Sequence, residues 1–280
     1  MEAQEKKDFL NSQNYVNREL SWIEFNYRVL SEARDKSLPL FERLKFLSIT
    51  SSNLDEFFMV RVASLKDLVH ANYTKPDIAG MTPGEQLEKI SKKAHELVSV
   101  QYSTYNRSII PALHQNGLNV LDGYEDLTPQ QEEYVDKYFK ENVYPVLTPM
   151  AVDSSRPFPL VHNKSLNIAA LLKKKKGGKE LEFAMVQVPA VLPRIVELPV
   201  TVAEDGRENH NVILLEEIIE KNMQSLFLNY DIITAHPFRI MRNADLTIDE
   251  EEAVDLLEEI QKQLKRRQWG EVIRLEIEEK

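Results

Sequence analysis

The most consequential absence in this 280-residue chain is cysteine, of which it has none. Without cysteine the protein has no disulfide bond, no thiolate nucleophile and no zinc site built on sulfur. Glycine is scarce as well, with 8 residues in the chain. Gly178-Lys179 is followed by Glu180, where a P-loop needs Ser or Thr, and no Gly-x-Gly-x-x-Gly fingerprint occurs. Two common sequence signatures of nucleotide binding are therefore excluded.

Long hydrophobic runs are also missing. The longest uninterrupted apolar run, residues 168–172, is far shorter than the roughly 20 residues that a membrane-spanning helix requires. Residues 1–13 are polar and charged, whereas a secretory signal needs an apolar core. We therefore expect a cytoplasmic protein with no transmembrane segment. Peripheral association with a membrane surface stays open.

Positive charge is in deficit. The 35 Lys and Arg residues are outnumbered by 45 Asp and Glu, which gives a formal net charge of −10. A general nucleic-acid-binding protein needs a basic surface to displace counterions, so we expect no nucleic-acid partner. The chain is 42% hydrophobic and 29% charged, as in ordinary globular proteins. Its length allows two domains.

Residues 14–116 have the hydrophobic spacing of a helical bundle. Four helices are expected, and capping residues or proline mark their starts at Ser21, Pro39, Asn53 and Thr82. Glu24 and Glu85 stand three residues after Ser21 and Thr82, as in a capping box. Pro111 should kink or end the fourth helix, and Asn116-Gly117 is the expected stop. Because the apolar faces need one another, we predict one helical domain.

Residues 117–280 predict an α+β domain with a mostly antiparallel sheet. Residues 166–172 and 181–188 predict two strands joined by a lysine-rich hairpin connection. The other expected elements are a helix from Thr128, a helix within 212–227, a strand at 232–241, a helix at 249–265 and a strand at 272–277. No partner element follows the last strand, so we expect this domain to be incomplete at its carboxy terminus and the chain to be a fragment.

Three short motifs in the helical region are more specific than any periodicity. They are ELSW…FN.RVL from Glu19, PL.ERLKFL from Pro39 and SNLDEFF.VR from Ser52. Together they resemble the amino-terminal domain of bacterial polyphosphate kinases of the first family. The likeness extends more thinly through the second domain, and the matching stretches are 183–189, 193–194, 198–199, 212–215, 229–231 and 242–245. The resemblance thus covers nearly the whole chain from Tyr15.

This resemblance implies a kinase that transfers the γ-phosphoryl group of ATP to polyphosphate through a phosphohistidine, with Mg²⁺ assisting. In that family the second, or head, domain mediates dimer formation. The catalytic histidines and the magnesium contacts lie in later domains that resemble phospholipase D, and no residue of this chain matches those motifs. The resemblance therefore implies that this chain contributes adenine binding and homodimer formation, holds no catalytic residue and no metal ligand, and is inactive alone.

Asn53 is the candidate nucleotide-binding residue. From the local pattern it is a helix cap with Glu56 reaching back. The resemblance gives it a second role, because the asparagine of the matching motif contacts the base of ATP. Asp55 and Glu56 would occupy the first turn of the helix and repel a triphosphate, whereas an amide suits the edge of a nucleobase. We therefore expect Asn53 to contact adenine and the phosphates to lie farther away.

Several cations accompany Asn53 in the helical region. They are Arg18, Arg28, Arg43, Lys45, Arg61 and Lys66. Most are expected on solvated faces beside acidic neighbours, and Arg61 is the best candidate to contact ATP or polyphosphate, two turns beyond Asn53 and about 80° around the helix. The lysine run 173–176 with Lys179 predicts a solvated hairpin tip, with polyphosphate binding as the alternative. None of the six histidines has a partner at metal-ligand spacing, and only His236 invites inspection.

Two other functions stay open at this point. One is a non-catalytic interaction module that forms dimers, and the other is a regulatory nucleotide sensor. A reading frame that continues into phospholipase D-like histidine motifs would favour the kinase, and a stop codon would favour the module. Measurable ATP binding by the isolated chain would favour the sensor.

Overall fold

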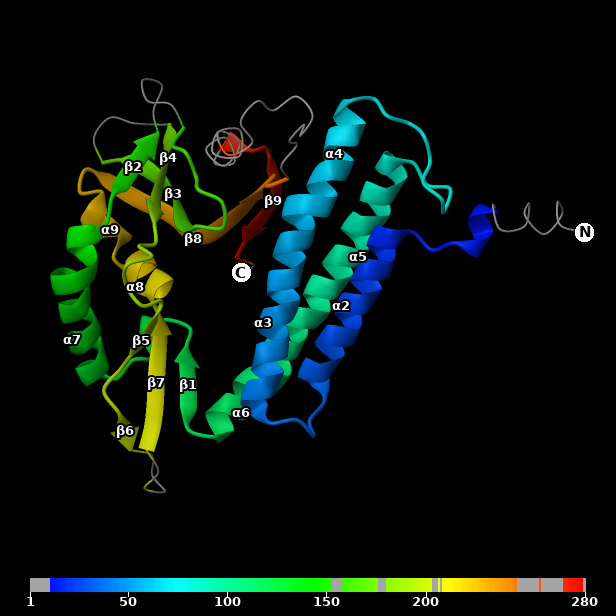
Figure 1. Ribbon diagram of the computed structural model, residues 1–280. Helices are drawn as coiled ribbons and strands as arrows, with labels where there is room; N and C mark the ends of the chain where they lie inside the picture. The colour runs from blue at the N-terminus through cyan, green and yellow to red at the C-terminus, as the bar shows by residue number, and fades with distance from the viewer. Residues whose placement is uncertain are drawn as a thin grey trace, which may run out of the picture. The chain divides into compact units, whose positions relative to one another are not determined.

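The chain divides into two compact units (Figure 1). The computed structural model describes residues 11–152, 158–175, 180–202, 206, 208–245, 257 and 269–278. One unit comprises Met1–Ala112 and Met241–Ile273, and the other comprises Leu113–Ile240 and Arg274–Lys280. Helices make up most of the first unit, and the strands lie mainly in the second. The expected class, a helical region followed by an α+β domain, is confirmed.

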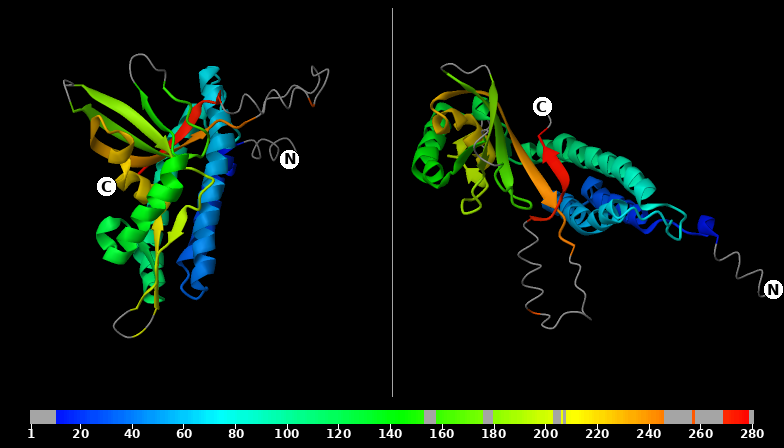
Figure 2. Two further views of the ribbon diagram at one scale, coloured as in Figure 1. Left: turned by 90° about the vertical axis from the view of Figure 1, so that its left-hand side faces the viewer. Right: turned by 90° about the horizontal axis from the view of Figure 1, so that it is seen from above.

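Three long helical rods form the first unit. Its elements are η1 (Ser12–Asn14), α2 (Arg18–Arg34), α3 (Leu40–Phe57), η2 (Phe58–Val62), α4 (Ala63–His70), α5 (Pro83–Thr104), η3 (Tyr105–Ile109) and α6 (Ile110–Gln115). Helix α2 packs against both α3 and α5, and α4 packs against α5 (Figure 1). Figure 2 shows the same helices from two further sides. The largest fully buried side chains between them are Ile23, Leu30, Leu54, Phe57, Ile90, Leu97 and Ile109.

Residues 40–70 form one continuous helical rod. No proline or glycine interrupts this stretch, and α3 passes through the π-helical segment η2 directly into α4. The hydroxyl of Thr50 donates to the Phe46 carbonyl, one turn earlier, at 2.8 Å, so this polar side chain is accommodated inside the helix. The prediction that a helix begins near Asn53 is therefore wrong.

The helix boundaries confirm some capping patterns and correct another. At Thr82 the expected capping box is present, with the Thr82 backbone N–H donating to Glu85 at 2.8 Å. Helix α2 instead begins before Ser21, because the Asn17 side chain caps it by accepting a hydrogen bond from the Leu20 N–H at 2.9 Å.

Pro111 does not end its helix. The π-helical segment η3 precedes it, and α6 continues through it to Gln115. Because a π-helical turn already departs from the α-helical bonding pattern, it gives the chain a place to accommodate a proline. The rod stops at the expected place, where Gly117 adopts a φ of 78° that favours glycine.

The second unit contains a four-stranded sheet in which β7 (Glu208–Leu214) is the central strand. It pairs in parallel with β1 (Leu118–Leu121) and antiparallel with β5 (Ile195–Glu197) and β6 (Thr201–Val202). The other sheet has five strands in the order β2-β4-β3-β8-β9. These are β2 (Pro149–Val152), β4 (Leu181–Gln187), β3 (Leu166–Lys174), β8 (Tyr230–Arg242) and β9 (Val272–Ile277). The strands are mostly antiparallel, as predicted, but they form two sheets.

The expected hairpin is confirmed in the larger sheet. β3 and β4 are antiparallel, with Ala170 opposite Ala184. The strands predicted at 232–241 and 272–277 correspond to β8 and β9. Residues 212–227 begin as strand β7 and become helical at Leu215, in α8 (Leu215–Lys221) and α9 (Met223–Leu226). The helix predicted at 249–265 lies outside the described residues, apart from Leu257, which is helical.

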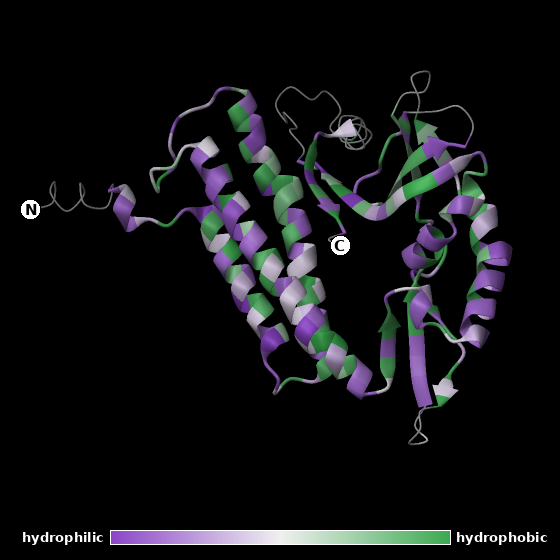
Figure 3. Ribbon diagram, turned by 180° about the vertical axis from the view of Figure 1, so that it is seen from behind, coloured by the Kyte–Doolittle hydropathy of each residue, from purple (hydrophilic) through white to green (hydrophobic). Residues whose placement is uncertain are grey.

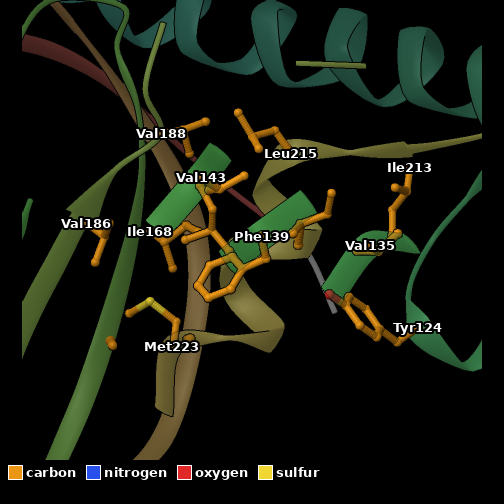
Figure 4. Close-up of a cluster of buried hydrophobic side chains, with 14 of the residues drawn as sticks. Tyr124, Val135, Phe139, Val143, Ile168, Val186, Val188, Ile213, Leu215 and Met223 are labelled. Atoms are coloured by element: carbon orange, nitrogen blue, oxygen red, sulfur yellow. The ribbon is translucent and has the colours of Figure 1, made fainter. Parts of the chain in front are cut away.

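Helix α7 (Pro129–Tyr138) and the π-helical segment η5 (Phe139–Val143) supply one wall of the second unit's core. Thr128 begins α7 with a capping box to Gln131. Figure 4 shows Phe139 among Val143, Ile168 and Met223, and all four side chains are almost fully buried. The core joins side chains from both sheets and from the helices, so the two sheets share one hydrophobic interior.

Figure 3 shows that hydrophilic and hydrophobic residues alternate around the helices of the first unit. Such amphipathic helices bury one face against their neighbours and expose the other to water. In the part of the chain that the structure describes, no helix combines the length and apolarity needed to cross a bilayer.

Candidate functional site

A cavity of about 350 Å³ lies between α2 and the rod formed by α3 and η2. Its lining residues all belong to the first unit, and they are Arg18, Glu19, Trp22, Phe25, Asn53, Glu56, Phe57, Val60 and Arg61. Both residues predicted to bind nucleotide, Asn53 and Arg61, are among them. The structure thus brings the two predicted residues into one cavity, and adds aromatic side chains from α2.

A network of side-chain hydrogen bonds holds the start of α2 at this cavity. The Asn17 amide donates to Asp77 Oδ2 at 2.8 Å and to Gln86 Oε1 at 2.9 Å, while its oxygen caps the helix. Asn17 is almost fully buried, so these bonds compensate the loss of water. Because Asn17 directly precedes Arg18 and Glu19, the network fixes the end of α2 from which both side chains reach the cavity.

Aromatic rings provide the apolar part of the lining. Trp22 stacks on Phe57 with ring centroids 4.2 Å apart and an angle of 6° between the ring planes. Phe25 also lines the cavity and leaves 47% of its surface exposed. A planar base with a π face can stack on rings of this kind. The aromatic lining therefore suits a nucleobase better than it suits a phosphate chain.

Asn53 lies in the interior of α3 and not at a helix terminus. Its Nδ2 donates to Asn26 Oδ1 at 3.0 Å, and Asn26 is completely buried. This is the one side-chain hydrogen bond that Asn53 makes among the described residues, and an amide can donate two and accept two. The Asn26 contact orients the amide and leaves hydrogen-bonding capacity for a ligand.

The two carboxylates after Asn53 have different surroundings. Asp55 is 3% exposed, whereas Glu56 is exposed and lines the cavity. The expectation that both occupy a first helical turn is wrong, because α3 begins at Leu40. A repulsion of phosphate from the Asn53 end is retained through Glu56 alone, by Coulomb's law and without a contribution from a helix terminus.

The π-helical segment η2 carries the far end of the cavity lining. It begins one residue after Phe57 and includes Val60 and Arg61. A π-helical turn inserts one residue relative to an α-helix and changes the direction of the side chains that follow it, and such turns are frequent at functional sites. No sequence signal identified this segment, because its residues are ordinary helix formers.

Arg61 reaches the cavity as one partner of an ion pair. Its Nε donates to Glu19 Oε1 at 2.8 Å, and its Nη2 contacts the same oxygen. The Glu19 side chain is 7% exposed and that of Arg61 is 45% exposed. The guanidinium charge is therefore largely balanced by a buried carboxylate, and part of the group remains accessible from the cavity.

Arg18 is a lining residue that sequence reasoning named only as one cation among several. It is exposed, and no carboxylate within the described segments forms an ion pair with it. Its position next to Glu19 in the sequence was the available signal, but only the packing of α2 against α3 shows that it faces the same cavity as Asn53. Its unpaired charge makes it better suited than Arg61 to bind an anion.

Known protein families match both parts of the chain. The profile described as the polyphosphate kinase N-terminal domain matches residues 15–121, and the profile described as the polyphosphate kinase middle domain matches residues 130–280. The chain belongs to the polyphosphate kinase family. The two profiles match the helical region and the α+β region in that order, so the chain holds the N-terminal and middle domains of this family.

Individual relatives carry the same name. The polyphosphate kinase of Lactiplantibacillus plantarum is 54% identical over 264 residues, which cover 94% of this chain and 36% of that protein. That of Bacillus anthracis is 52% identical over 267 residues, 94% of this chain and 37% of the relative. The crystal structure of polyphosphate kinase from Porphyromonas gingivalis matches with a TM-score of 0.72 at 28% identity, over 89% of this chain and 37% of that one. The chain thus spans little more than a third of these relatives.

The remaining cations of the helical region have structural partners. Buried Arg43 donates to the Ala33 carbonyl at 2.9 Å and to Ser108 Oγ at 2.7 Å. Lys45 pairs with Glu42 at 2.7 Å, as its solvated position predicts. The others pair with an acid or contact a ring, and they are Lys66 with Glu271 and Arg28 with Phe25. None of these four lines the cavity.

The lysine-rich hairpin connection is described only in part. Lys173 and Lys174 belong to β3, Lys174 pairs with Glu182 at 2.6 Å, and Lys175 donates to the Leu228 carbonyl at 3.0 Å. Lys176 and Lys179 lie outside the described residues. Lys174 thus contacts strand β4 and Lys175 contacts the segment before β8, and polyphosphate binding by the run stays a prediction.

A second hollow, of about 510 Å³, lies along α7 and η5. Its charged lining consists of Glu132, Glu133, Asp136, Glu141, Lys137 and Lys140. Four carboxylates oppose two ammonium groups, so the hollow has a net negative charge that would repel a polyphosphate. Although it is larger, its chemistry does not fit an anionic ligand.

Two histidines have carboxylate partners that their sequence spacing does not show. His70 lies with Asp67 and Glu271, and His236 lies with Glu220 and Glu278. The prediction concerned spacing along the sequence, whereas these clusters form through tertiary packing. Each cluster joins residues from distant parts of the chain, so no local motif could have indicated it.

Proposed function

We propose that this chain is the nucleotide-side portion of a polyphosphate kinase, which transfers the γ-phosphoryl group of ATP to polyphosphate. The cavity between α2 and α3 would bind the adenine of ATP. The observation that carries the proposal is the meeting of Asn53, three aromatic rings and two arginines in one cavity of a chain from this family. Rings and an amide fit a purine, and guanidinium groups fit phosphates.

The charged side chains are distributed unevenly along the cavity, and this distribution supports one orientation of the ligand. Asn53 and Glu56 lie in α3, and Arg61 lies eight positions beyond Asn53, about 12 Å along a helix. A carboxylate beside Asn53 favours a neutral base there over a triphosphate. Arg18 and Arg61 would attract the phosphates at the opposite end. This orientation agrees with the expectation that Asn53 contacts adenine while the phosphates lie farther away.

Phosphoryl transfer requires groups that the cavity does not supply. We propose that the histidine that accepts the phosphoryl group and the residues that hold Mg²⁺ belong to a part of the enzyme that these 280 residues do not contain. The cavity lining contains no histidine, which is consistent with a role in binding and not in chemistry. On this proposal the isolated chain is inactive, and the phosphoprotein intermediate forms elsewhere.

We further propose that the enzyme is a cytoplasmic homodimer, with peripheral membrane association as an additional expectation. The family resemblance of the second unit to the head domain supports self-association. Exposed apolar residues on and around β5 and β6 also support it, and they are Val191, Ile195, Val200 and Val202. Light scattering of the purified protein across concentrations would measure the dimer.

The decisive experiment replaces Asn53 in a polyphosphate kinase that carries this sequence. Loss of one hydrogen bond to the base, about 0.5–1.5 kcal/mol, should raise the KM for ATP about 2- to 13-fold with little change in kcat. Exposed Ser52, its neighbour, provides the matched control as Ser52→Ala. An unchanged KM in Asn53→Ala, with the same thermal stability as the control, would refute adenine binding at this position.

A regulatory nucleotide sensor is the second candidate. All lining residues belong to one unit, which favours ATP binding by the isolated chain. The chain has two tryptophans, and Trp269→Phe would leave Trp22 as the single fluorescent reporter in the cavity. Tight quenching by ATP would favour the sensor, whereas weak quenching with activity only in the longer enzyme would favour the kinase portion.

A further inference from the structure

Three side chains of the second unit converge on a small half-buried volume. Glu220 comes from α8, His236 from β8, and Glu278 directly follows β9. One potential ligand atom from each lies within 4.8 Å of the others, and all three residues are partly buried. This cluster takes no part in the cavity described above, since no residue is common to both.

The backbone places the two residues from the sheet side by side. The Glu278 N–H donates to the carbonyl of Pro237 at 3.3 Å, next to His236. As a result Glu278 Oε2 lies 3.3 Å from His236 Nδ1. Glu220, near the end of α8, completes the group from a third element.

Thr234 contacts the other ring nitrogen of His236. Its Oγ1 lies 2.5 Å from His236 Nε2, on the side of the ring opposite Nδ1. Thr234 Oγ1 can accept a hydrogen bond from Nε2–H, and in that tautomer Nδ1, the nitrogen within hydrogen-bond distance of Glu278, can bind a metal ion. Histidines that bind metals commonly have their other ring N–H held by an oxygen in this way, because the bond selects the tautomer and orients the ring.

The donor atoms of the cluster suit a metal cation. Two carboxylates and the Nδ1 of an imidazole in that tautomer can all donate electron pairs to a metal ion, and their partial burial weakens the screening by water. We propose that Glu220, His236 and Glu278 bind a divalent transition-metal ion of the zinc or manganese class. One imidazole and two carboxylates form a common donor set for such ions, whereas Mg²⁺ and Ca²⁺ prefer oxygen ligands alone.

The distances support this assignment. Donor atoms bound to a tetrahedral zinc ion, with bonds of about 2.0–2.1 Å, lie about 3.4 Å apart. The hydrogen-bond distance of 3.3 Å between Nδ1 and Oε2 is close to that value, so a metal ion could replace the proton between these two atoms. Glu220, within 4.8 Å of the other ligand atoms, needs a side-chain adjustment of up to about 1.4 Å to complete three bonds. The ion would connect α8, β8 and the residue after β9, and so stabilise the second unit.

The cluster of Asp67, His70 and Glu271 in the first unit makes a useful comparison. Its three residues are exposed, Lys66 pairs with Glu271 at 3.1 Å, and Asn243 donates to Asp67 at 3.0 Å. Water screens the attraction between exposed carboxylates and a cation more strongly than it does at a partly buried site. We therefore expect weaker metal binding there, and His70→Gln serves as a control that removes it.

Titration of the purified chain with Co²⁺ tests the proposal, because Co²⁺ substitutes for zinc and its visible absorption reports coordination. We expect one Co²⁺ site, from which Zn²⁺ displaces the Co²⁺. His236→Gln and Glu278→Gln should abolish this site, and Thr234→Val should weaken it about tenfold through loss of the orienting bond. His70→Gln and exposed His210→Gln should retain it.

Two measurements protect the test against misfolding. Circular dichroism of each metal-free variant should match that of the wild-type chain, and binding in the wild type should raise its melting temperature. A nitrogen NMR spectrum of the histidines should show that the Nδ1 signal of His236 shifts when Zn²⁺ is added. The proposal is refuted if no Co²⁺ spectrum appears, if His236→Gln binds as the wild type does, or if His236 responds to protons but not to Zn²⁺.

Discussion

The ion pair between Arg61 and Glu19 leads to a quantitative prediction about the candidate site. Arg61→Gln removes the positive partner and leaves the Glu19 carboxylate, whose side chain is 7% exposed, without its guanidinium. A carboxylate in such a place keeps its desolvation cost and loses its compensation. The variant should therefore be less stable even in the absence of any ligand.

The magnitude follows from the exposure of the two partners. Removing one member of a fully buried pair costs about 3–5 kcal/mol, and an exposed pair contributes about 0–1 kcal/mol. Because Glu19 is buried but the Arg61 side chain is 45% exposed, we expect Arg61→Gln to lower the free energy of unfolding by about 1–3 kcal/mol. Adding Glu19→Gln should recover part of the loss, with a coupling energy of about 1–2 kcal/mol.

Urea unfolding, followed by Trp22 fluorescence in a Trp269→Phe background, would measure the free energy of unfolding of the first unit. Arg18→Gln is the matched control, because Arg18 is exposed and has no ion pair within the described residues, so its stability should change by less than about 0.5 kcal/mol. If Arg61→Gln were as stable as the control, or if the double-mutant coupling energy were zero, the burial of the Glu19 carboxylate would not require its ion pair with Arg61, and the prediction would be refuted. The control also separates ligand binding from stability. Loss of ATP binding in Arg18→Gln, without a change in stability, would indicate that Arg18 contacts the phosphates.

Two further predictions concern pH. Hydrogen bonds from the Thr82 backbone and hydroxyl lower the pKa of Glu85 below its usual 4.5. The Glu85 carboxylate therefore stabilises the fold at neutral pH, and this contribution is lost as the pH falls below 4.5 through the lowered pKa. Glu85→Gln should reduce the decline of the urea midpoint at acid pH, and an unchanged pH profile would contradict the prediction. Burial raises the pKa of Tyr124 from 10.0 to about 12, so its contribution to stability is complete below pH 10 and is lost as the pH rises to about 12. Ultraviolet titration should show Tyr124 ionising near pH 12, and Tyr124→Phe should remove that component.

Local patterns predicted the elements whose causes are local. The capping boxes at Thr82 and Thr128 each need only a hydroxyl and an acid or amide three residues later, and both are present. The β3–β4 hairpin likewise follows from two apolar runs close together in the sequence. Asn53 is the instructive failure, because a good capping residue stands in the interior of a helix when its neighbours can all continue the helix.

The candidate site could be predicted only in part. Asn53 and Arg61 were identified through the motif that surrounds them, and the structure places both in one cavity. The aromatic wall from α2 and the free charge of Arg18 were not identified, because α2 and α3 meet only through tertiary packing. The ion pair between Arg61 and buried Glu19 could not be predicted either, because 42 residues separate them in the sequence.

By itself the amino-acid sequence determined the fold class, most helices and strands, and the motifs that mark the family, because each depends on residues near one another along the chain. The tertiary structure alone decided which side chains share a volume. Trp22 against Phe57, Glu19 against Arg61, and His236 between Glu220 and Glu278 are all pairs or groups made by folding. Packing and burial set the strength of these contacts, and neither quantity can be obtained from spacing in the sequence.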